Sequence, residues 1–406
     1  MGVIVQKFGG TSVGSIERIK NAAEKIIKTY EKGNKVVVVV SAMGGTTDEL
    51  ISMASEITDK PDKREMDVLL STGEQVTIAL LTMCIHSMGY KATSLLGHQA
   101  EVKTDSQSGS ARILQVGKEK VSKLLDEDNI VVVAGFQGID DSGNITTLGR
   151  GGSDTSAVAV AAAINADICE IYTDVDGIYT TDPNICKKAR KMGRVSYDEM
   201  LEMASLGAKV LQIRSVEFAK KYQVPLHVRS SFNEEEGTMV VNDDTDMEKV
   251  LVSGVTYNKN EARITLKNVP DQPGIAAKIL TPISDAGILV DMIIQNTRST
   301  GLTDFTFTVP KTEFFEAVEL SQKISDSIGA GEVIGDENIS KVSVIGVGMK
   351  SHSGVASKMF EALAHENINI KMISTSEIRV SCIIAEKYTE LAVRALHTAF
   401  GLDTEE

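Results

Sequence analysis

The chain has 406 residues, which is longer than one hydrophobic core usually supports, so its length predicts two or three domains. Its formal net charge of -14 disfavours binding to nucleic acids or anionic membranes, because clustered Lys and Arg hold both kinds of partner. A small-molecule enzyme is the class that fits this acidic composition best.

The cysteines and the apolar runs indicate the cellular compartment. The four cysteines are far apart and form no CxxC pair, which argues against a zinc site or a disulfide framework. The N-terminus leads directly into a strand-like Val3–Val5 without a secretory leader, and the longest apolar runs are too short to cross a bilayer. We therefore expect a cytoplasmic protein that has reduced thiols and no protein-bound metal.

Residues 3–230 alternate short β-branched runs with longer helical patterns. This alternation is typical of βαβ units and predicts an α/β domain, with an open, mostly parallel sheet between two layers of helices. Buried strands are expected at residues 3–7, 36–40, 130–133 and 170–173. Each is followed by a glycine-bearing turn and a helix, and ligands bind at such turns in open α/β sheets.

The first of these turns has the sequence KFGGTSV at residues 7–13, before a helix expected over residues 15–29. Glycines let the backbone approach a phosphate closely, the helix N-terminus supplies free N–H groups, and Lys7 adds a positive charge. The order differs from that of a P-loop, because the lysine precedes the glycines. A tight turn that serves packing alone is the simpler alternative.

A second glycine-rich turn, TLGRGGSD at residues 147–154, precedes an Ala-rich helix. Arg150 presents a planar fork that binds a carboxylate through two hydrogen bonds, and the flanking glycines let a substrate lie against the main chain. Asp154 either caps the helix or holds a catalytic lysine in place. A solvated arginine in a surface turn is the alternative for Arg150.

Two further segments supply polar groups for a zwitterion. Ser41 and Thr47 follow the second strand, and Glu74 ends the motif STGE at residues 71–74, which we expect to begin a helix. The two hydroxyls suit the carboxylate of an amino acid, and Glu74 suits its ammonium group. Helix capping explains each segment taken alone.

The kind of group that accepts a phosphoryl group from ATP is predicted from what these motifs lack. None of them contains a histidine, and a hydroxyl acceptor would need a general base. A carboxylate acceptor, with a pKa of about 4, needs none. A polar loop at residues 172–183 suits a nucleotide base and ribose, and GAKVL at residues 207–211 adds Lys209. The motifs together predict phosphoryl transfer from ATP to a carboxylate, with Lys7, Lys209 and the Mg²⁺ of ATP neutralising the moving charge.

An acidic, polar stretch at residues 233–246 predicts a surface linker and a domain boundary near residue 245. Beyond it the sequence repeats itself with an offset of 80, so that Gly354 corresponds to Gly274 and Met372 to Met292. Each copy predicts a strand, a glycine turn, a helix and further strands, and hence a small α/β module. The turns offer backbone amides to a carboxylate, although a duplication without a ligand is the alternative.

Four motifs taken together resemble the aspartokinase family: KFGGTSV at residues 7–13, TLGRGGSD at 147–154, YTDVDGIYTTDP at 172–183 and STSEIRVS at 374–381. The resemblance covers nearly the whole chain and fits the monofunctional bacterial type. It implies an amino acid kinase fold for residues 1–245 and two ferredoxin-like ACT domains at residues 246–330 and 331–406. The implied reaction converts ATP and L-aspartate to ADP and 4-phospho-L-aspartate, the first step toward lysine, threonine and methionine.

The resemblance also assigns site residues, motif by motif. The catalytic residues would be Lys7, Asp154 and Lys209. The residues that contact ATP, which brings its Mg²⁺, would be Lys7, Phe8, Gly9, Gly10, Ser41, Ser153, Thr173, Asp174, Tyr179, Thr180, Thr181, Asp182, Pro183, Asn184 and Lys209. The residues that contact L-aspartate would be Ser41, Thr47, Asp48, Glu49, Glu74, Arg150, Gly151, Gly152 and Ser153. Glu74 would bind the ammonium group, and Arg150 the α-carboxylate.

The ACT domains imply feedback inhibition by lysine, threonine or both, and assembly into a homo-oligomer. The effector would contact Asp271, Gly274, Leu289, Val290, Asp291, Gln295, Asn296, Val355, Ala356, Asn369, Ile370, Thr375 and Ser376. Relatives of this type also imply a shorter subunit from an internal start, for which Met247 is the candidate. An ordinary internal methionine is the alternative.

Two other functions stay open from the sequence. The phosphate-binding motifs do not identify the acceptor, so another carboxylate kinase of the same fold, for example one that acts on glutamate, is the first. The second is a non-catalytic amino-acid sensor that keeps its ACT domains on an inactive kinase scaffold. The presence of Lys7, Asp154 and Lys209 argues against the sensor.

Overall fold

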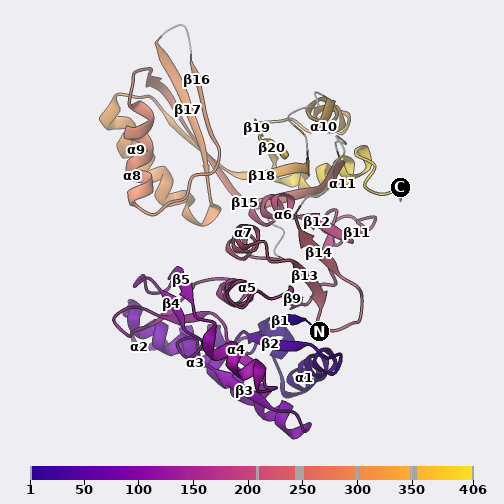
Figure 1. Ribbon diagram of the computed structural model, residues 1–406. Helices are drawn as coiled ribbons and strands as arrows, with labels where there is room; N and C mark the ends of the chain where they lie inside the picture. Colours follow the sequence, from indigo (N-terminus) through magenta and orange to yellow (C-terminus); the bar gives the residue numbers. More distant parts are fainter. Residues whose placement is uncertain are drawn as a thin grey trace. The chain divides into compact units, whose positions relative to one another are not determined.

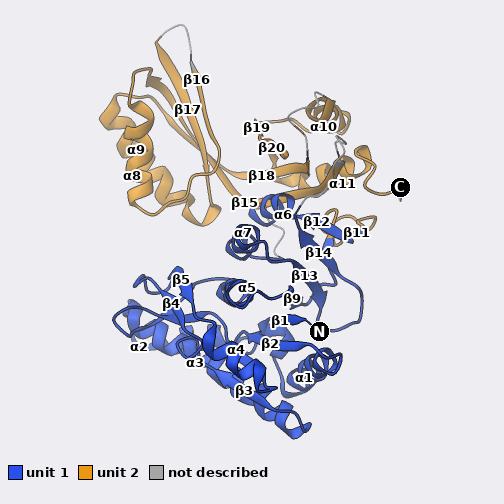
Figure 2. Cartoon of the chain, viewed as in Figure 1, with its two compact units in different colours: residues 1–178, 191–205, 209–246 blue, residues 179–190, 206–208, 247–406 orange. Residues whose placement is uncertain are grey.

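The computed structural model describes residues 2–206, 210–242, 251–297, 301–347, 349 and 354–404. They divide into two compact units (Figure 2). The first unit takes the described residues of 1–178, 191–205 and 209–246, and the second takes those of 179–190, 206–208 and 247–406. The regions on which Lys209 and Met247 fall lie outside the described residues.

The first unit is built on an eight-stranded sheet with the order β12-β14-β13-β9-β1-β2-β6-β3 (Figure 1). All neighbouring strands are parallel except β13 and β14. The strands are β1 (Val3–Phe8), β2 (Lys35–Val40), β3 (Ala92–Leu95), β6 (Ile130–Ala134), β9 (Ile168–Thr173), β12 (Arg194–Ser196), β13 (Leu226–Ser230) and β14 (Thr238–Val241). The four strands expected from the β-branched runs are all present, and they lie side by side.

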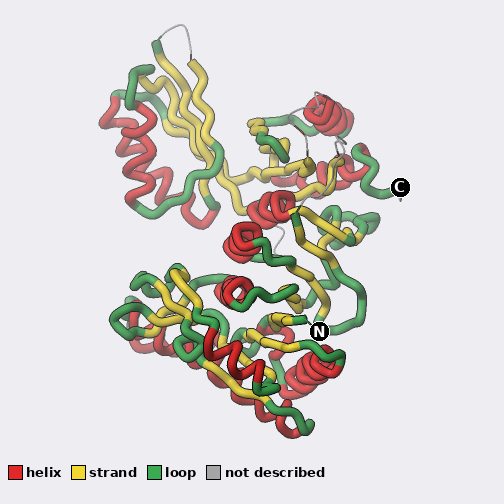
Figure 3. The backbone as a smooth tube through the Cα atoms, viewed as in Figure 1, coloured by secondary structure: helices red, strands yellow, loops and turns green. Residues whose placement is uncertain are grey.

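Helices cover both faces of this sheet, and helix and strand alternate along the chain (Figure 3). The helices are α1 (Ile16–Glu31), α2 (Thr46–Ile57), α3 (Lys63–Ser87), α4 (Glu119–Asp126), α5 (Gly152–Ala163), α6 (Tyr197–Ser205) and α7 (Ile213–Tyr222), with the 3₁₀ turn η1 (Gly10–Val13). Buried side chains of α1 and α3 share one core with alternate residues of β2 and β6. Helix α5 packs on β1, β2 and β9 from the other side, with α7 against it (Figure 1).

Smaller strands complete the first unit. A four-stranded sheet has the order β5-β4-β7-β8. Its strands are β4 (Val102–Thr104), β5 (Ile113–Val116), β7 (Gln137–Ile139) and β8 (Ile145–Thr147). Two strands of two residues each, β10 (Ile178–Tyr179) and β11 (Lys191–Met192), lie at the two ends of the segment 179–190, and Tyr179 of β10 is its first residue.

The expected start of a helix at Ser71 is wrong, because α3 begins eight residues earlier at Lys63. The Asp62 carboxylate caps it by accepting hydrogen bonds from the N–H groups of Arg64 and Glu65, at 3.0 and 3.2 Å. Glu74 therefore lies in the middle of a helix and not in its first turn. At 25 residues, α3 is long and apolar enough to cross a membrane, but it carries buried Asp67 and Glu74 and packs on the sheet as a core helix.

The second unit contains a six-stranded antiparallel sheet with the order β16-β17-β15-β18-β20-β19 (Figure 1). Its strands are β15 (Leu251–Pro270), β16 (Ile293–Thr297), β17 (Leu302–Val309), β18 (Val333–Val347), β19 (Met372–Thr375) and β20 (Arg379–Ala385). Its helices are α8 (Ile275–Asp285), α9 (Phe314–Ile328), α10 (Gly354–His365) and α11 (Thr389–Ala399), with the 3₁₀ turns η2 (Lys311–Glu313) and η4 (Glu386–Tyr388).

Two hydrophobic cores divide this sheet into two βαββαβ modules. The first module, built around Ala262, Phe305 and Ile324, uses the second part of β15, α8, β16, β17, α9 and the start of β18. The second module uses the rest of β18, α10, β19, β20 and α11. The repeat with an offset of 80 therefore corresponds to a duplicated structural unit, with α8 and α10 in equivalent places.

The modules are not strictly consecutive along the chain. Val255, at the start of β15, packs in the core of the second module, although it precedes the first module in the sequence. This is possible because β15 is 20 residues long and shifts its register against β18 near Asn258 and Glu261, so one strand serves both modules. The expected division at residue 330 stays a prediction, and the packing adds that the first part of β15 belongs with the second module.

Candidate active site

An ion pair lies at the carboxyl end of the central strand of the first unit. The Nζ of Lys7, near the end of β1, is 2.6 Å from Oδ1 of Asp154, in the first turn of α5, and only 11% and 10% of the two side chains are exposed. The N-cap of α5 is Gly151, which has no side chain to cap the helix, so Asp154 pairs with Lys7 and does not act as the cap. A buried ammonium group is thus held next to an uncapped helix N-terminus, where anions bind favourably.

The glycine turn after β1 meets two other strand ends. Gly9 N–H donates to the carbonyl of Tyr172 at 3.3 Å, and Gly44 N–H donates to the carbonyl of Gly10 at 3.0 Å. A Cβ atom on Gly10 would lie 3.0 Å from the Ala42 carbonyl oxygen, so this close approach favours glycine. The structure therefore brings together the motifs at residues 7–13 and 41–48 and the start of the loop at 172.

Glu74 reaches the same region from α3. Its Oε1 accepts a hydrogen bond from Ala42 N–H at 3.0 Å, while Oε2 has no hydrogen-bond partner among the described residues. Only 3% of Glu74 is exposed, and this burial raises the pKa of its carboxyl from 4.5 to about 7. Gly73 permits the approach, because a Cβ there would lie 2.7 Å from the Cβ of Ala42. A buried carboxylate with a free oxygen suits a ligand ammonium group.

The other residues expected to contact substrate near β2 are more exposed. Ser41 and Thr47 are half-buried, while Asp48 and Glu49 are exposed. Asp48 and Glu49 lie in the first turn of α2, after an N-cap glycine with a φ of 89°. Negative charges in the first turn stabilise a helix, and this effect alone explains why Asp48 and Glu49 occur there.

The Arg150 turn is held by two residues that the sequence analysis missed. The fully buried Asp67 carboxylate accepts hydrogen bonds from the Thr147 hydroxyl at 2.5 Å and from Gly109 N–H at 3.0 Å. Arg214 donates to the carbonyls of Leu148 and Ala111, at 2.6 and 3.0 Å. Both side chains thus join the loop around residue 110 to the turn. The partners in these hydrogen bonds are between 42 and 103 residues apart in the sequence. No local sequence pattern indicates contacts over such separations.

Within this turn, Arg150 is exposed and lies between two glycines with φ values of 75° and 71°. A Cβ atom on Gly151 would lie 1.8 Å from the Cγ of Gln212, so a larger residue is excluded there. Gly152 and Ser153 are buried at the start of α5, and a Cβ on Gly135 would lie 2.8 Å from the Ser153 Cβ. The turn therefore has a fixed backbone that leaves the Arg150 side chain available to a ligand.

The residues expected to bind ATP that remain to be located fall into four groups. The Phe8 side chain is fully buried and stacks on Tyr172, with ring centroids 4.6 Å apart, so only its backbone is available to a nucleotide. Thr173 and Asp174 lie at the end of β9 and form a hydrogen bond of 3.1 Å with each other. Residues 179–184 belong to the second unit, and Lys209 lies outside the described residues.

The residues expected to bind an effector lie at corresponding places of the two modules. Asp271–Gly274 is the turn before α8, and Gln295 and Asn296 lie on the edge strand β16. In the second module, Val355 and Ala356 are in the first turn of α10, Asn369 and Ile370 precede β19, and Thr375 and Ser376 lie at its end. Leu289 is 74% exposed and Val290 is half-buried beside it.

Asp291 already has a cationic partner. Its carboxylate pairs with the ammonium group of Lys341, which also lies 2.7 Å from Oε1 of Glu261. Lys341 and Glu261 are each 5% exposed, and burial raises the pKa of Glu261. An effector ammonium group that binds Asp291 would therefore compete with Lys341.

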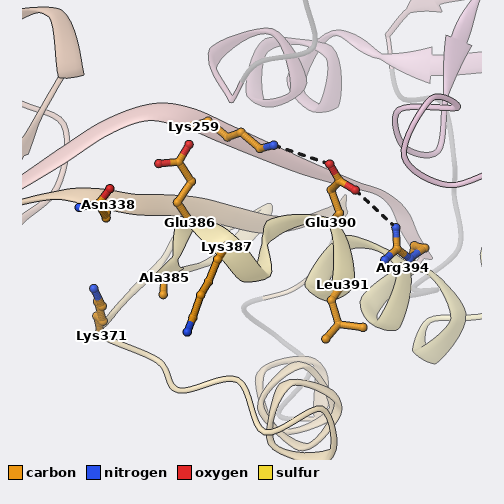
Figure 4. A pocket seen from close by; sticks show the side chains of 9 residues that line it. All are labelled: Lys259, Asn338, Lys371, Ala385, Glu386, Lys387, Glu390, Leu391 and Arg394. Atoms are coloured by element: carbon orange, nitrogen blue, oxygen red, sulfur yellow. Dashed lines mark ion pairs between the residues drawn. The ribbon is translucent and has the colours of Figure 1, made fainter.

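A cavity of about 820 Å³ lies in the second unit, around η4 and α11 (Figure 4). Its lining residues are Lys259, Asn338, Lys371, Ala385, Glu386, Lys387, Glu390, Leu391 and Arg394. Lys259 and Arg394 point toward Glu390, with ion-pair distances of 3.9 and 3.8 Å (Figure 4). None of the residues expected to bind substrate, nucleotide or effector lines this cavity, so the candidate active site lies elsewhere.

Three family models match the chain. The model of the amino acid kinase family matches residues 2–230, and two models of ACT domains match residues 263–326 and 342–400. These matches confirm the expected fold, an amino acid kinase domain followed by two ACT domains.

The chain is similar to known enzymes over nearly its whole length. It is 59% identical to the aspartate kinase of Pseudomonas putida over 404 residues, which cover 99% of this chain and 98% of the relative. The crystal structure of E. coli aspartokinase III in complex with aspartate and ADP (R-state) matches with a TM-score of 0.81 at 25% identity, covering 98% of this chain and 99% of that one. The structure of the same E. coli enzyme with lysine and aspartate (T-state) matches with a TM-score of 0.77, at the same identity and coverage.

Glu74→Gln is expected to stabilise the protein in a pH-dependent way. Because the folded pKa of about 7 exceeds the ordinary 4.5, the folded state binds this proton more tightly than the unfolded state, and stability falls as pH rises between these values. At about pH 8 the variant should gain on the order of 1–3 kcal/mol, and at about pH 5 most of this gain should vanish. The midpoint of thermal unfolding, measured at both pH values, checks this.

The control is Glu65→Gln, which alters an exposed carboxylate near the start of the same helix. It should not reproduce the gain at high pH. An equal gain from Glu74→Gln at both pH values would show that the buried charge is not its source.

Proposed function

The chain belongs to the aspartokinase family and is an aspartate kinase, and we propose that its first unit transfers the γ-phosphoryl group of ATP to the side-chain carboxylate of L-aspartate. A carboxylate oxygen attacks the γ-phosphorus as the bond from that phosphorus to the bridging oxygen breaks, giving 4-phospho-L-aspartate and ADP. The observation that carries this proposal is the buried Lys7–Asp154 pair beside the glycine turn. A carboxylate is already deprotonated near neutral pH, so this site needs no general base.

Lys7 is the proposed electrostatic catalyst. Its ammonium group stabilises negative charge on the moving phosphoryl group, and Asp154 fixes its position. The backbones of Gly9 and Gly10 receive phosphate oxygens, and Lys209 adds a second positive charge. Asp154 would organise Lys209 as well as Lys7.

Magnesium is proposed to arrive with the nucleotide. Among the described residues, no three His, Cys, Asp or Glu side chains gather into a group that could hold a metal. Mg²⁺ does not require such a cluster, because substrate phosphates and waters commonly hold it together with one or two carboxylates. When bound, the ion neutralises phosphate charge, while the protein residues position the acceptor.

The acceptor is proposed to bind between α3 and the Arg150 turn. Glu74 offers a free carboxylate oxygen to the ammonium group of aspartate, and Arg150 offers its fork to the α-carboxylate. Ser41 and Thr47 add hydroxyls, and Gly151, Gly152 and Ser153 let the substrate lie against the main chain. These contacts leave the side-chain carboxylate as the nucleophile.

The wider setting follows from this reaction. We place the enzyme in the cytoplasm, at the first step toward lysine, threonine and methionine, and its four free cysteines agree with a reducing compartment. We propose that the ACT modules assemble into a homo-oligomer and bind lysine, threonine or both. A shorter subunit that starts at Met247 would contain both modules.

The acceptor assignment is tested by ADP release with L-aspartate and L-glutamate side by side, in the wild type and in Arg150→Lys. Aspartate should be the preferred substrate. Replacing the fork by a point charge should raise the KM for aspartate about tenfold or more and leave the KM for ATP nearly unchanged. An unchanged KM for aspartate would remove Arg150 from the acceptor site, and equal use of glutamate would overturn the substrate assignment.

Regulation is tested by activity with lysine, threonine and both, in the wild type and in Thr375→Ile. An inhibitor acts only if it binds the inactive arrangement of the enzyme more tightly than the active one. Thr375, at the end of β19, is one of the residues proposed to bind the inhibitor. The variant should lose sensitivity by at least tenfold in inhibitor concentration while keeping its uninhibited rate. Equal sensitivity in both proteins would exclude Thr375 from the effector site.

A further inference from the structure

The segment 179–190 lies within the amino acid kinase match in the sequence but folds as part of the second unit (Figure 2). It contains six of the residues proposed to bind ATP, Tyr179–Asn184. The second unit also contains both ACT modules. The conformation of a proposed nucleotide-binding segment is therefore set by residues of the regulatory unit.

Strand β15 holds the start of this segment. Val255 N–H donates to the carbonyl of Thr180 at 2.8 Å, and two residues further along β15 the Tyr257 hydroxyl donates to Oδ2 of Asp182 at 3.0 Å. The other oxygen of Asp182 accepts from Asn184 N–H at 2.8 Å. Both oxygens of one carboxylate are thus occupied, one by the regulatory module and one by the turn that leads to Asn184.

Helix α11 holds the same segment through His397, which is fully buried. Its Nε2 lies 2.9 Å from the Thr180 hydroxyl oxygen, and its Nδ1 lies 3.7 Å from the Cys186 sulfur. The Thr180 hydroxyl also accepts from Arg190 N–H at 3.0 Å, so its own proton is available to Nε2. The ring therefore joins two points of the segment, Thr180 near its start and Cys186 in its middle, to α11.

The charges around His397 favour a neutral ring. Burial lowers its pKa, with the cations Arg190 and Lys188 acting in the same direction and Asp403 against them. Arg190 donates from Nε to the Leu402 carbonyl at 2.8 Å, and Lys188 lies 3.2 Å from Asp403. The end of the segment is thus fastened to the residues that follow α11.

We propose that Tyr257 and His397 are positioning residues for ATP: they fix the conformation of residues 180–184 from the second ACT module and thereby set the affinity for the nucleotide. This rests on the proposed function and on the nucleotide-binding role that the resemblance to the family implies for Tyr179–Asn184. The side chains of Asp182 and Thr180 are engaged by the module, so their contribution to ATP binding is to shape the backbone of the segment. A change in β15 or α11 reaches the nucleotide through these two contacts.

The test is Tyr257→Phe in the full-length enzyme, which deletes one hydroxyl and keeps the ring. The charged Asp182 carboxylate then loses the hydrogen bond from the Tyr257 hydroxyl, so the KM for ATP should rise about 3- to 10-fold. The kcat and the KM for aspartate should stay within about twofold of the wild-type values. The matched control is Tyr388→Phe, a half-buried tyrosine packed on the same core, which should leave all three parameters unchanged.

A second pair of variants addresses His397. His397→Ala should raise the KM for ATP, and His397→Gln, which keeps a hydrogen-bonding atom near the position of Nε2, should restore most of the affinity. The proposal is overturned if Tyr257→Phe leaves the KM for ATP unchanged, if it raises the two KM values equally, or if His397→Gln is no better than His397→Ala. Failure of the proposed function would be seen separately, as a wild type that releases no ADP with aspartate.

Discussion

The Lys7 ammonium and the Asp154 carboxylate lie 2.6 Å apart, nearly out of contact with solvent. Each charge needs the other, because an unpaired buried charge costs several kcal/mol, on the order of 3–5 when one partner of a pair is removed. The pair can form only if β1 lies inside the sheet and α5 begins at the carboxyl end of that strand. The parallel order β9-β1-β2, with α5 packed on all three strands, meets both conditions.

Close backbone packing around this pair explains the glycine-rich character of the motifs. Gly10, Gly73 and Gly151 each stand where a Cβ atom would meet a neighbouring segment at 3.0 Å or less. Each lets a different element approach, namely the end of β2, helix α3 and the start of α7. The buried Asp67 carboxylate and the hydrogen bonds from Arg214 to two backbone carbonyls then fix the Arg150 turn. The site is thus a set of turns held in place by the packing of neighbouring elements, one of which, α3, also supplies Glu74.

Much of this could be predicted from the sequence, because the signals were local. The β-branched runs marked β1, β2, β6 and β9, and the repeat with an offset of 80 marked the duplicated modules. The true start of α3 also had a local signal that was overlooked, since Asp62 is followed three residues later by Glu65, as in a capping box. The pattern at Ser71 and Glu74 resembles a helix start as well, but it lies eight residues inside α3.

The rest depends on contacts between distant residues. Tyr257 and Asp182 are 75 positions apart, and Thr180 and His397 are 217 apart, so no periodicity in a short window indicates that residues 179–190 join the second unit. The sharing of β15 by both modules is likewise a property of strand pairing, which a linear repeat does not show. The Lys341–Asp291 pair was also missed, because a buried lysine in a strand looks the same in sequence as an exposed one.

The central claim is that Lys7 and Asp154 act as one unit in phosphoryl transfer. The most direct measurement is kcat at saturating ATP and aspartate for Lys7→Ala, Asp154→Asn and the double variant. If Asp154 acts by holding Lys7, the double variant should be about as slow as Lys7→Ala alone, a loss on the order of 10²–10³ or more. Losses that multiply in the double variant would show that the two residues act independently and would contradict this account.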